Sequence, residues 1–400
     1  MHNNTYEVWN MKALNILKPP LKIIQILHHS PSVLSADFQQ VMYDGWHARF
    51  GRELFKRTNY EVECLTFDPS VKNAFTAQKD GIIYRAFPSS MSYAFLYEYS
   101  RELIRYLKKV SSERNDTIFH IHGFPGIMTY AIASKFRNNV VVIQDHGGQL
   151  SGWNFGWSFL GKYSLRNVDF FFTVSEILKE ELIKYIGVDP KRIKVQTMGV
   201  DTNFFRPIPR SKCREILGLP ADKYLVIYVG RFYDFKGLPL LVKIIRRLKT
   251  KYDVELIAVG GYQNDSLFTH VKREIPYSFG RIQHEILPYY YNAANVFAWF
   301  WKDVRYGGPG VSLMEAMACN ISIVSNTLIY SKVNKELSRE KLEEKGCYIP
   351  YNIRELEFYI EKALTKNNCK TRDLAKKYFS WDAIISSTQS IYKNLLNVKT

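Results

Sequence analysis

Residues 228–248, YVGRFYDFKGLPLLVKIIRRL, contain the features that decide the fold. A short apolar run ends at Gly230, and Gly237 precedes a stretch whose apolar residues recur at helical spacing. A strand that ends in a glycine turn and enters a helix is the repeating unit of an α/β domain with a parallel sheet. The stretch therefore predicts one strand, turn and helix of a doubly wound sheet.

Two cations, Arg231 and Lys236, lie five residues apart within that turn. A guanidinium, an ammonium and the free N–H groups at the start of a helix all favour phosphate oxygens. Cations in a surface loop are usually only solvated, but their place at a strand-to-helix turn favours a ligand. We therefore interpret Gly230, Arg231 and Lys236 as a diphosphate clamp.

The same alternation of short β-rich runs and longer amphipathic stretches extends in both directions. In the N-terminal half, buried strands, each followed by a helix, are predicted at 22–29, 61–67, 117–122, 140–144 and 169–174. In the C-terminal half they are predicted at 224–230, 254–261, 296–301 and 321–325. Two doubly wound domains are expected, facing each other across a cleft at the carboxyl ends of both sheets.

A break in this alternation at residues 200–210, VDTNFFRPIPR, marks the interdomain linker, because two prolines follow an aromatic pair there. The last predicted helix, from about residue 372 to 396, carries Trp381 and a long apolar stripe that needs a surface to pack on. The expected division is an N-terminal domain at 1–205, a C-terminal domain at 206–375 and a terminal helix at 376–400.

The composition is that of a folded protein, since 46% of the 400 residues are hydrophobic and 23% are charged. The 55 lysines and arginines exceed the 38 acidic residues, and the net charge of +17 favours anionic partners such as phosphorylated substrates or acidic lipid surfaces. Nucleic acid is not an expected partner, because no reading motif appears and the positive charge is not gathered in one tail or stripe.

The cysteines and histidines indicate no metal site. The five cysteines are scattered without a CxxC pair, and histidines 28, 29, 120, 122 and 146 lack a convincing third ligand by spacing. No Asp-x-Asp motif occurs, so we expect the two cations of the clamp, and no bound divalent ion, to neutralise a diphosphate. The N-terminus lacks the apolar core of a secretory signal and no apolar run reaches the length of a membrane span, which predicts a cytoplasmic location.

A second glycine-rich turn lies within residues 305–326, RYGGPGVSLMEAMACNISIVSN. Gly308 and Gly310 allow a ligand to approach the backbone. Glu315 follows in an apolar helical stretch, where a carboxylate is costly to bury without a partner. An exposed carboxylate on a helix surface fits poorly with these apolar flanks. We therefore interpret Glu315 as the acceptor for both hydroxyls of a ribose.

Taken in order, these motifs resemble those of the family 4 retaining glycosyltransferases, which have the GT-B fold of two Rossmann-like domains. The sequence VGRFYDFKG, at 229–237, is similar to the family's diphosphate-binding VGRxxxxKG. The segment at 280–297 resembles the one whose backbone holds the nucleotide base, here near Arg281 and Ile282. The sequence GVSLMEAMA, at 310–318, resembles the second half of the family's paired-glutamate motif.

The N-terminal half and the last helix extend the resemblance to roughly residues 20–398. IQDHGG, at 143–148, is similar to the family's donor-facing histidine motif and implies that His146 lies beside the sugar. Residues 174–207 resemble the family's approach to the linker. Residues 378–396 resemble the terminal helix that crosses back onto the first domain.

The chain departs from the family pattern at two places. Gly307 stands where the family has the first glutamate of its pair, and residues 28–40 carry serines and a proline in place of a glycine-rich turn. Two alternatives therefore stay open beside a transferase: a catalytically silent scaffold that binds sugar nucleotides, and a nucleotide-sugar epimerase of the same architecture. Only the transferase requires an acceptor.

The resemblance implies metal-independent transfer of a hexose-type sugar, with retention, from a UDP- or GDP-sugar to a hydroxyl of a glycan or lipid-linked acceptor. No permanently bound cofactor and no metal are expected. The implied catalytic residues are His146, Arg231 and Lys236. The implied nucleotide-binding residues are Gly230, Arg231, Lys236, Arg281, Ile282, Gly308, Gly310, Val311 and Glu315.

Two segments bear on the acceptor. Residues 92–110 and 150–167 mix aromatic and cationic residues, as segments do that meet anionic lipid headgroups. The alternative for each is a core helix with a solvated basic face. Peripheral association with the inner face of the cell membrane is thus an expectation that the sequence leaves open.

Overall fold

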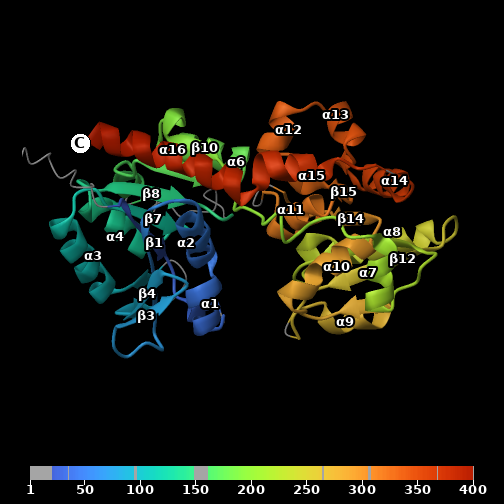
Figure 1. The fold of residues 1–400 in the computed structure, drawn as a ribbon, viewed down its shortest axis with the longest axis horizontal. Helices are drawn as coiled ribbons and strands as arrows, with labels where there is room; N and C mark the ends of the chain where they lie inside the picture. Colours follow the sequence, from blue (N-terminus) through green and yellow to red (C-terminus); the bar gives the residue numbers. More distant parts are fainter. Residues whose placement is uncertain are drawn as a thin grey trace, which may run out of the picture.

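The computed structural model describes residues 20–34, 36–93, 97–147, 161–263, 265–304, 308–366 and 368–399. Its backbone forms two sheet-containing units that lie side by side, joined by the linker and by a long C-terminal helix (Figure 1). Gly307 and most of the membrane-facing candidate at 150–167 lie outside the described residues.

The N-terminal unit is built on an eight-stranded sheet with the order β10-β9-β8-β7-β1-β2-β4-β3. Its strands are β1 (Lys22–Leu27), β2 (Glu61–Asp68), β3 (Phe75–Lys79), β4 (Ile82–Pro88), β7 (Ile118–His122), β8 (Val140–Gln144), β9 (Phe170–Thr173) and β10 (Ile193–Val195). A separate pair is formed by β5 (Met91–Ser92) and β6 (Glu98–Tyr99). In the large sheet every pair is parallel except β3 with β4.

The prediction of a helix after the strand at 61–67 is wrong. An antiparallel strand follows β2 instead, and Asp80 and Gly81 connect β3 to β4 with φ angles of 53° and 80°. Positive φ at both central residues is the geometry of the tight hairpin turn that an Asp-Gly pair favours. The Asp-Gly pair is visible in the sequence and indicates a hairpin, which the regular alternation of strands and helices does not include.

Helices cover the N-terminal sheet (Figure 1). They are α1 (Phe38–Asp44), α2 (Trp46–Arg57), α3 (Arg101–Glu113), α4 (Ile127–Lys135) and α6 (Glu176–Glu181), which continues into the π-helical turn η2 (Leu182–Ile186). Asp37, Ser100 and Ser175 accept backbone hydrogen bonds at the starts of α1, α3 and α6, as N-cap residues do. Gly45 separates α1 from α2.

The C-terminal unit is a six-stranded, wholly parallel sheet with the order β13-β12-β11-β14-β15-β16. Its strands are β11 (Tyr224–Val229), β12 (Val254–Val259), β13 (Tyr277–Phe279), β14 (Val296–Trp299), β15 (Ser322–Ser325) and β16 (Cys347–Tyr348). The order reverses between β11 and β14, and a ligand crevice in such a sheet opens at the carboxyl ends of the strands at this point.

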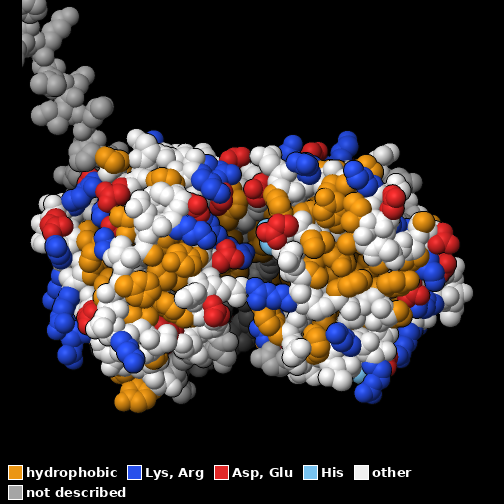
Figure 2. All heavy atoms as spheres, turned by 60° about the horizontal axis from the view of Figure 1, so that its bottom comes forward, with side chains coloured by type: hydrophobic (Ala, Val, Ile, Leu, Met, Phe, Trp, Pro, Cys, Tyr) orange, Lys and Arg blue, Asp and Glu red, His pale blue; other side chains and the backbone are white. Residues whose placement is uncertain are grey.

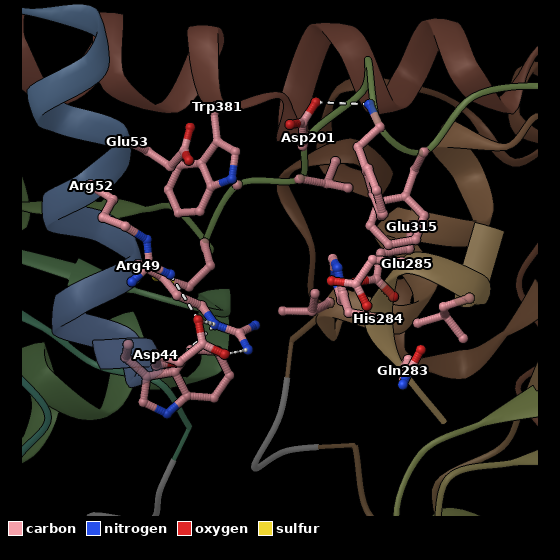
Figure 3. Close-up of a pocket in the computed structure, with 18 of the residues that line it drawn as sticks. Asp44, Arg49, Arg52, Glu53, Asp201, Gln283, His284, Glu285, Glu315 and Trp381 are labelled. Carbon is pink, nitrogen blue, oxygen red and sulfur yellow. Dashed lines mark hydrogen bonds and ion pairs between the residues drawn. The ribbon is translucent and has the colours of Figure 1, made fainter. Parts of the chain in front are cut away.

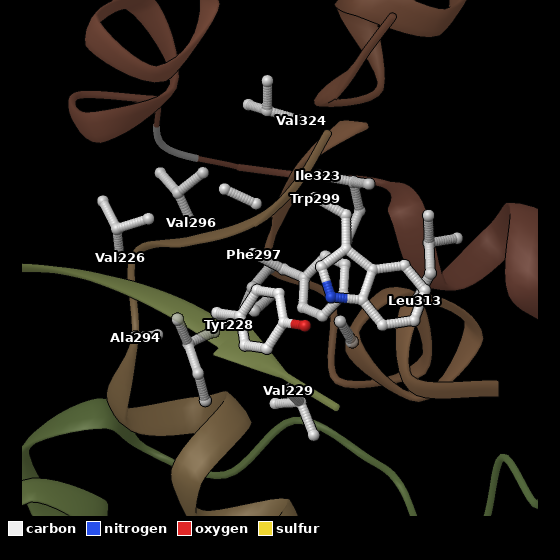
Figure 4. Packing of buried hydrophobic residues seen from close by; sticks show 14 of the residues in the cluster. Val226, Tyr228, Val229, Ala294, Val296, Phe297, Trp299, Leu313, Ile323 and Val324 are labelled. Carbon is white, nitrogen blue, oxygen red and sulfur yellow. The ribbon is translucent and has the colours of Figure 1, made fainter. Parts of the chain in front are cut away.

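The helices of this unit are α7 (Arg210–Leu217), α8 (Leu238–Leu248), α9 (Phe268–Glu274), α10 (Leu287–Ala293), α11 (Val311–Ala318), α12 (Lys332–Glu336), α13 (Arg339–Glu344), α14 (Ile353–Leu364) and α15 (Thr371–Leu374). The core combines aliphatic side chains with the rings of Tyr228, Phe297 and Trp299, which are all at most 3% exposed (Figure 4). This packing fixes the strand ends that carry the glycine turns.

The C-terminal helix crosses back onto the N-terminal unit, as the sequence predicts. It is α16 (Trp381–Lys399), and the Trp381 and Phe50 rings lie 6.0 Å apart while the Tyr392 hydroxyl lies 2.6 Å from His120 Nδ1. The prediction of one continuous helix from residue 372 is wrong, because the π-helical turn η7 (Ala375–Phe379) ends at an extended Ser380. Ser380 pairs with Val200 in an isolated parallel bridge.

The predicted fold of two doubly wound domains and a returning helix is therefore confirmed. The segment at 92–110 includes most of α3, whose apolar residues Leu103, Leu107 and Val110 are buried in the core. Its exposed face is basic, so the alternative of a core helix with a solvated basic face describes it. Among the described helices, none combines the length and the hydropathy that spanning a bilayer requires.

Candidate functional site

A cleft of about 860 Å³ lies between the two units and is visible as the hollow in Figure 2. One wall is formed by α1 and α2, including Trp46 and Arg49. The opposite wall is formed by residues 281–287 and the start of α11 (Figure 3). The linker at 198–205 and Trp381 close the back.

Glu315 projects from α11 into this cleft although its residue is only 5% exposed. The Tyr291 hydroxyl donates to its Oε2 at 2.7 Å, and His284 Nε2 lies 3.8 Å from its Oε1. These partners offset the cost of burying the carboxylate. The nearby carboxylate of Glu315 raises the pKa of His284.

His284 lies on the linker side of the cleft. Its ring stacks on Phe204 with centroids 5.1 Å apart and an interplanar angle of 6°, and it meets the edge of Phe205 at 5.3 Å. The side chain is 54% exposed. Arg281 and Ile282, the predicted base-binding pair, line the same wall, and Arg281 reaches across to Gln40 at 3.4 Å.

Arg231 lies just beyond the end of β11 and is fixed by Asp265. Its Nη2 and Nε each lie 2.6 Å from Asp265 Oδ1, and the guanidinium also lies over the rings of Tyr233 and Tyr262, at 4.8 and 4.4 Å. Burial opposes ionisation of Asp265, but hydrogen bonds from Arg231 and from the backbone of Tyr262 and Phe232 outweigh it and lower the pKa. A held guanidinium is prepared to bind an anion.

Lys236 ends the short 3₁₀ turn η4 (Asp234–Lys236) that follows Arg231. Its ammonium lies 5.5 to 6.0 Å from the rings of Phe235, Trp299 and Trp301. Burial and the charge of Arg231 lower the pKa of Lys236 to about 8. Among the described residues no carboxylate lies within 4 Å of this ammonium, which leaves a cation available for a ligand.

Glycines set the close approaches around these cations. Gly237 has φ 80°, and a Cβ there would lie 2.0 Å from the Phe300 carbonyl oxygen. A Cβ on Gly230 would lie 3.4 Å from the Trp299 ring and 3.9 Å from Lys236 Nζ. Only glycine fits the close approach at 237, whereas at 230 the contacts are ordinary and the φ angle of 150° is what favours glycine.

The second glycine turn leads into α11 and packs against both units. A Cβ on Gly308 would lie 2.2 Å from the Val174 carbonyl oxygen of the N-terminal unit. A Cβ on Gly310 would lie 2.8 Å from the Trp299 ring. Val311 is the first residue of α11 and lines the cleft with Glu315. Trp299 thus lies between the turn that carries Lys236 and the turn that leads to Glu315.

His146 lies one ring behind the cleft wall. It stacks against Trp46, with centroids 5.0 Å apart and an interplanar angle of 12°, and on its other side against His122 at 5.2 Å and 9°. His122 Nε2 in turn donates a hydrogen bond to Gln25 Oε1 in β1 at 2.6 Å. Burial and neighbouring histidines lower the pKa of His146 to about 3, so the imidazole is neutral at physiological pH.

The predicted site residues thus form two groups. Arg281, Ile282, Val311 and Glu315 line the interdomain cleft, whereas Gly230, Arg231, Lys236, Gly308, Gly310 and His146 lie outside its lining. The sequence analysis missed Asp265, Tyr291, His284 and Trp46. Of these, His284 and Tyr291 lie in the segment at 280–297 that the sequence analysis singled out, whereas Asp265 and Trp46 lie in no such segment. Among the described residues, no group of three His, Cys, Asp or Glu side chains is arranged to hold a metal ion.

Two family models match the chain in consecutive order. Residues 47–204 match Glycosyltransferase Family 4, and residues 209–379 match Glycosyl transferases group 1. Their boundary falls in the linker that lines the back of the cleft.

Curated relatives are similar over part of their length. An uncharacterized glycosyltransferase of Methanocaldococcus jannaschii is 25% identical over 240 residues, which is 55% of this chain and 59% of the relative. The O-antigen chain mannosyltransferase B of Escherichia coli is 25% identical over 254 residues, covering 58% and 62%. A D-inositol 3-phosphate glycosyltransferase of Gordonia bronchialis is 37% identical over 98 residues, covering 23% and 21%. The chain therefore spans less than two thirds of each of these relatives.

Solved structures match the fold over nearly the whole chain. Sucrose-phosphate synthase from Thermosynechococcus elongatus superposes with a TM-score of 0.69 at 19% identity, covering 94% of this chain and 99% of that one. HepE of Anabaena, solved in complex with UDP, gives 0.66 at 14% identity, covering 93% and 100%. With its two family domains in order and this architecture, the chain belongs to the family 4 glycosyltransferases of the GT-B fold.

Proposed function

We propose that this chain transfers a hexose-type sugar from a nucleoside-diphosphate sugar to an acceptor hydroxyl, with retention of anomeric configuration. One observation carries the proposal: a carboxylate held in the cleft, Glu315, is linked through Trp299 and the glycine turns to two cations, Arg231 and Lys236, at the end of β11. A nucleoside diphosphate offers a ribose for the first and phosphates for the second.

In this proposal the cations stabilise the departing diphosphate. Negative charge builds on the oxygen that leaves the anomeric carbon, and Arg231 and Lys236 are held in place before it develops. Stabilisation by one such donor is worth about 3 kcal/mol. Lys236 suits this role because its buried ammonium has no carboxylate within 4 Å in the described part of the chain, while Arg231 is oriented by Asp265.

The nucleoside is assigned to the cleft. Glu315 would accept hydrogen bonds from the ribose hydroxyls while Tyr291 and His284 hold its carboxylate. The base would lie near Arg281 and Ile282. The structures of relatives solved with UDP or UDP-2-fluoro glucose favour a UDP-sugar, with a GDP-sugar as the other donor in the proposal.

On the acceptor side, the hydroxyl would attack on the face from which the diphosphate leaves, without a nucleophile from the protein. His146 would position the sugar, and Trp46 is the ring of its stack that lines the cleft. A glycan or a lipid-linked saccharide is the proposed acceptor. The basic face of α3, with Arg101, Arg105 and Lys108 exposed, supports association with an anionic membrane surface in the cytoplasm by charge alone.

In this proposal the chain has three parts with separate roles. Residues 1–205 would bind the acceptor, residues 206–375 the donor, and residues 376–400 would join the second part to the first. The positions of the cations after β11 and of Glu315 on α11, all in the C-terminal unit, support this division. No divalent metal is included, because two side-chain cations are available for the diphosphate.

The test is a panel of UDP- and GDP-sugars incubated with the protein, with and without EDTA and saccharide acceptors, while the release of nucleoside diphosphate and the products are quantified. We expect one donor to be consumed with EDTA present, Lys236→Ala to lower turnover, and Glu315→Ala to weaken nucleotide binding. Lys272→Ala, which removes an exposed lysine of α9, is the matched control. Donor binding without transfer or hydrolysis would select the silent scaffold, and conversion of the donor without an acceptor would select the epimerase.

A further inference from the structure

A second cavity, of about 80 Å³, lies where the two units and the returning helix meet. Three lysines from three different elements line it: Lys194 of β10, Lys332 of α12 and Lys377 of η7. Two serines, Ser331 and Ser387, line it as well. The cavity shares none of its lining residues with the large cleft.

Positive charge in this cavity exceeds the negative charge paired with it in the described residues, because three lysines face one carboxylate. Among the described residues no carboxylate lies within 4 Å of Lys194, whose ammonium donates to Ser387 Oγ at 2.5 Å. Lys332 and Lys377 share one carboxylate, Glu336, at 3.4 and 3.8 Å. Burial and the charge of Lys332 lower the pKa of Lys194, as expected for a partly buried ammonium with another cation nearby.

The cavity has the size and the donors for a tetrahedral oxyanion. Its volume is several times the roughly 15 Å³ that a cavity needs to hold one water molecule. Lysine ammoniums are compact charges suited to phosphate. The serine hydroxyls donate within the protein, Ser331 to the Leu328 carbonyl oxygen and Ser387 to Gln196 Oε1, so the three lysines are the donors for the ligand. We propose that this cavity binds a phosphate group, either inorganic phosphate or a phosphomonoester, at a site separate from the diphosphate clamp.

Such a ligand would act on the placement of the two units. Lys194 belongs to the N-terminal sheet and Ser387 to α16, whereas Lys332 belongs to the C-terminal unit. Pro309, in the glycine turn that leads to Glu315, lines the same cavity beside Val174. A bound phosphate would therefore join the units directly behind the turn that supports the donor site, and it would stabilise the folded chain by linkage.

The experiment measures binding of inorganic phosphate to the full chain by calorimetry and by thermal melting, in a buffer free of phosphate and at constant ionic strength set with NaCl. Lys236→Gln is used as the background so that the diphosphate clamp contributes little. We expect a saturable rise in melting temperature with phosphate in this background. Adding Lys194→Gln should raise the dissociation constant for phosphate about tenfold, which corresponds to the loss of one charge-assisted hydrogen bond.

Lys376→Gln is the matched control, because it removes an equal charge from an exposed residue next to Lys377 that does not line the cavity. Lys332→Gln provides a second test at an exposed position, which keeps the proposal falsifiable if Lys194→Gln does not fold. The proposal is overturned if both cavity variants bind phosphate as tightly as the control does, or if NaCl alone reproduces the stabilisation. A hexose monophosphate compared with inorganic phosphate identifies which source of the phosphate group the site accepts.

Discussion

The Asp265 carboxylate lies 2.6 Å from the Arg231 guanidinium and also accepts hydrogen bonds from the backbone of Phe232 and Tyr262, at 2.9 and 3.0 Å. Asp265 follows β12, whereas Arg231 follows β11, so the loop after one strand sets the direction of the cation after its neighbour. The Asp265 side chain is fully buried. The proposed diphosphate clamp therefore depends on a carboxylate that is not expected to touch the donor.

Asp265→Asn tests this dependence. A carboxamide has one accepting atom and one donating group, so it cannot accept from Arg231 and both backbone N–H groups together. We expect a loss of about 1–3 kcal/mol in the free energy of unfolding and weaker binding of nucleoside diphosphate. Urea denaturation and calorimetry with UDP and GDP measure both. Asp253→Asn, at an exposed residue after α8, is the control, and equal behaviour of the two variants would contradict the role of Asp265.

Binding of the nucleoside diphosphate should weaken above pH 8. The pKa of Lys236 is lowered to about 8 by burial and by Arg231, so the free protein loses this positive charge as the pH rises through 8. A diphosphate favours the ammonium, and the affinity should fall up to about tenfold per pH unit above the pKa. Calorimetry between pH 7 and 9.5 measures the decline. Lys236→Arg keeps its charge over this range and should flatten the profile; a parallel decline in that variant would assign the effect to another group.

Glu315→Gln should weaken nucleotide binding more than it changes stability. The variant side chain can still accept the Tyr291 hydroxyl through its oxygen, but its amide then faces His284 and the cleft with donors only. Losing an ionised acceptor for ribose costs about 1.5–3 kcal/mol, which is roughly ten- to a hundredfold in the dissociation constant. Glu285→Gln changes an exposed glutamate that also lines the cleft. If both variants bind alike, the ribose is not held by Glu315.

Acid should destabilise the N-terminal unit through buried histidines. His47 is fully buried, neither ring nitrogen has a hydrogen-bond partner among the described residues, and burial lowers its pKa to about 3. Above pH 6.5 the folded and unfolded chains are both neutral here, but between 6.5 and 3 only the unfolded chain takes up the proton, so stability falls as the pH falls. His47→Leu should reduce the loss of unfolding free energy between pH 7 and 5 by about 2 kcal/mol.

Chemical denaturation at both pH values checks this difference. His270→Leu, at an exposed histidine of α9, should leave the loss unchanged. An equal loss in the His47 variant and in the unaltered chain would show that other groups, including His28 and His120 with pKa values lowered by burial to about 4 and 3, account for the acid sensitivity.

Local spacing determined what the sequence could predict. Arg231 and Lys236 belong to one turn whose geometry follows from the glycines on both sides. Glu315 could be predicted as a site residue because it is a carboxylate among apolar neighbours. Asp265 carries no such signal, because its partner is 34 residues away and only the pairing of β11 with β12 brings them together. The place of His146 behind Trp46 likewise depends on how α2 packs, which no motif contains.

The hairpin and the terminal helix show two kinds of error. The Asp80-Gly81 pair by itself predicts a hairpin turn, but a helix was expected there because βαβ units were assumed to repeat regularly. The break at Ser380 was not readable, since it arises where the chain pairs with Val200, 180 residues earlier. Patterns within a few residues were sufficient to predict most helices and strands, whereas contacts between distant segments could be found only in the structure.

The bridge between Val200 and Ser380 gives the C-terminal unit the topology of an insertion. The chain leaves the N-terminal unit near one member of the bridge and returns near the other, so its two crossings between the units lie side by side. This adjacency makes the unit a natural subject for circular permutation, with new termini in its outer loops and both crossings intact.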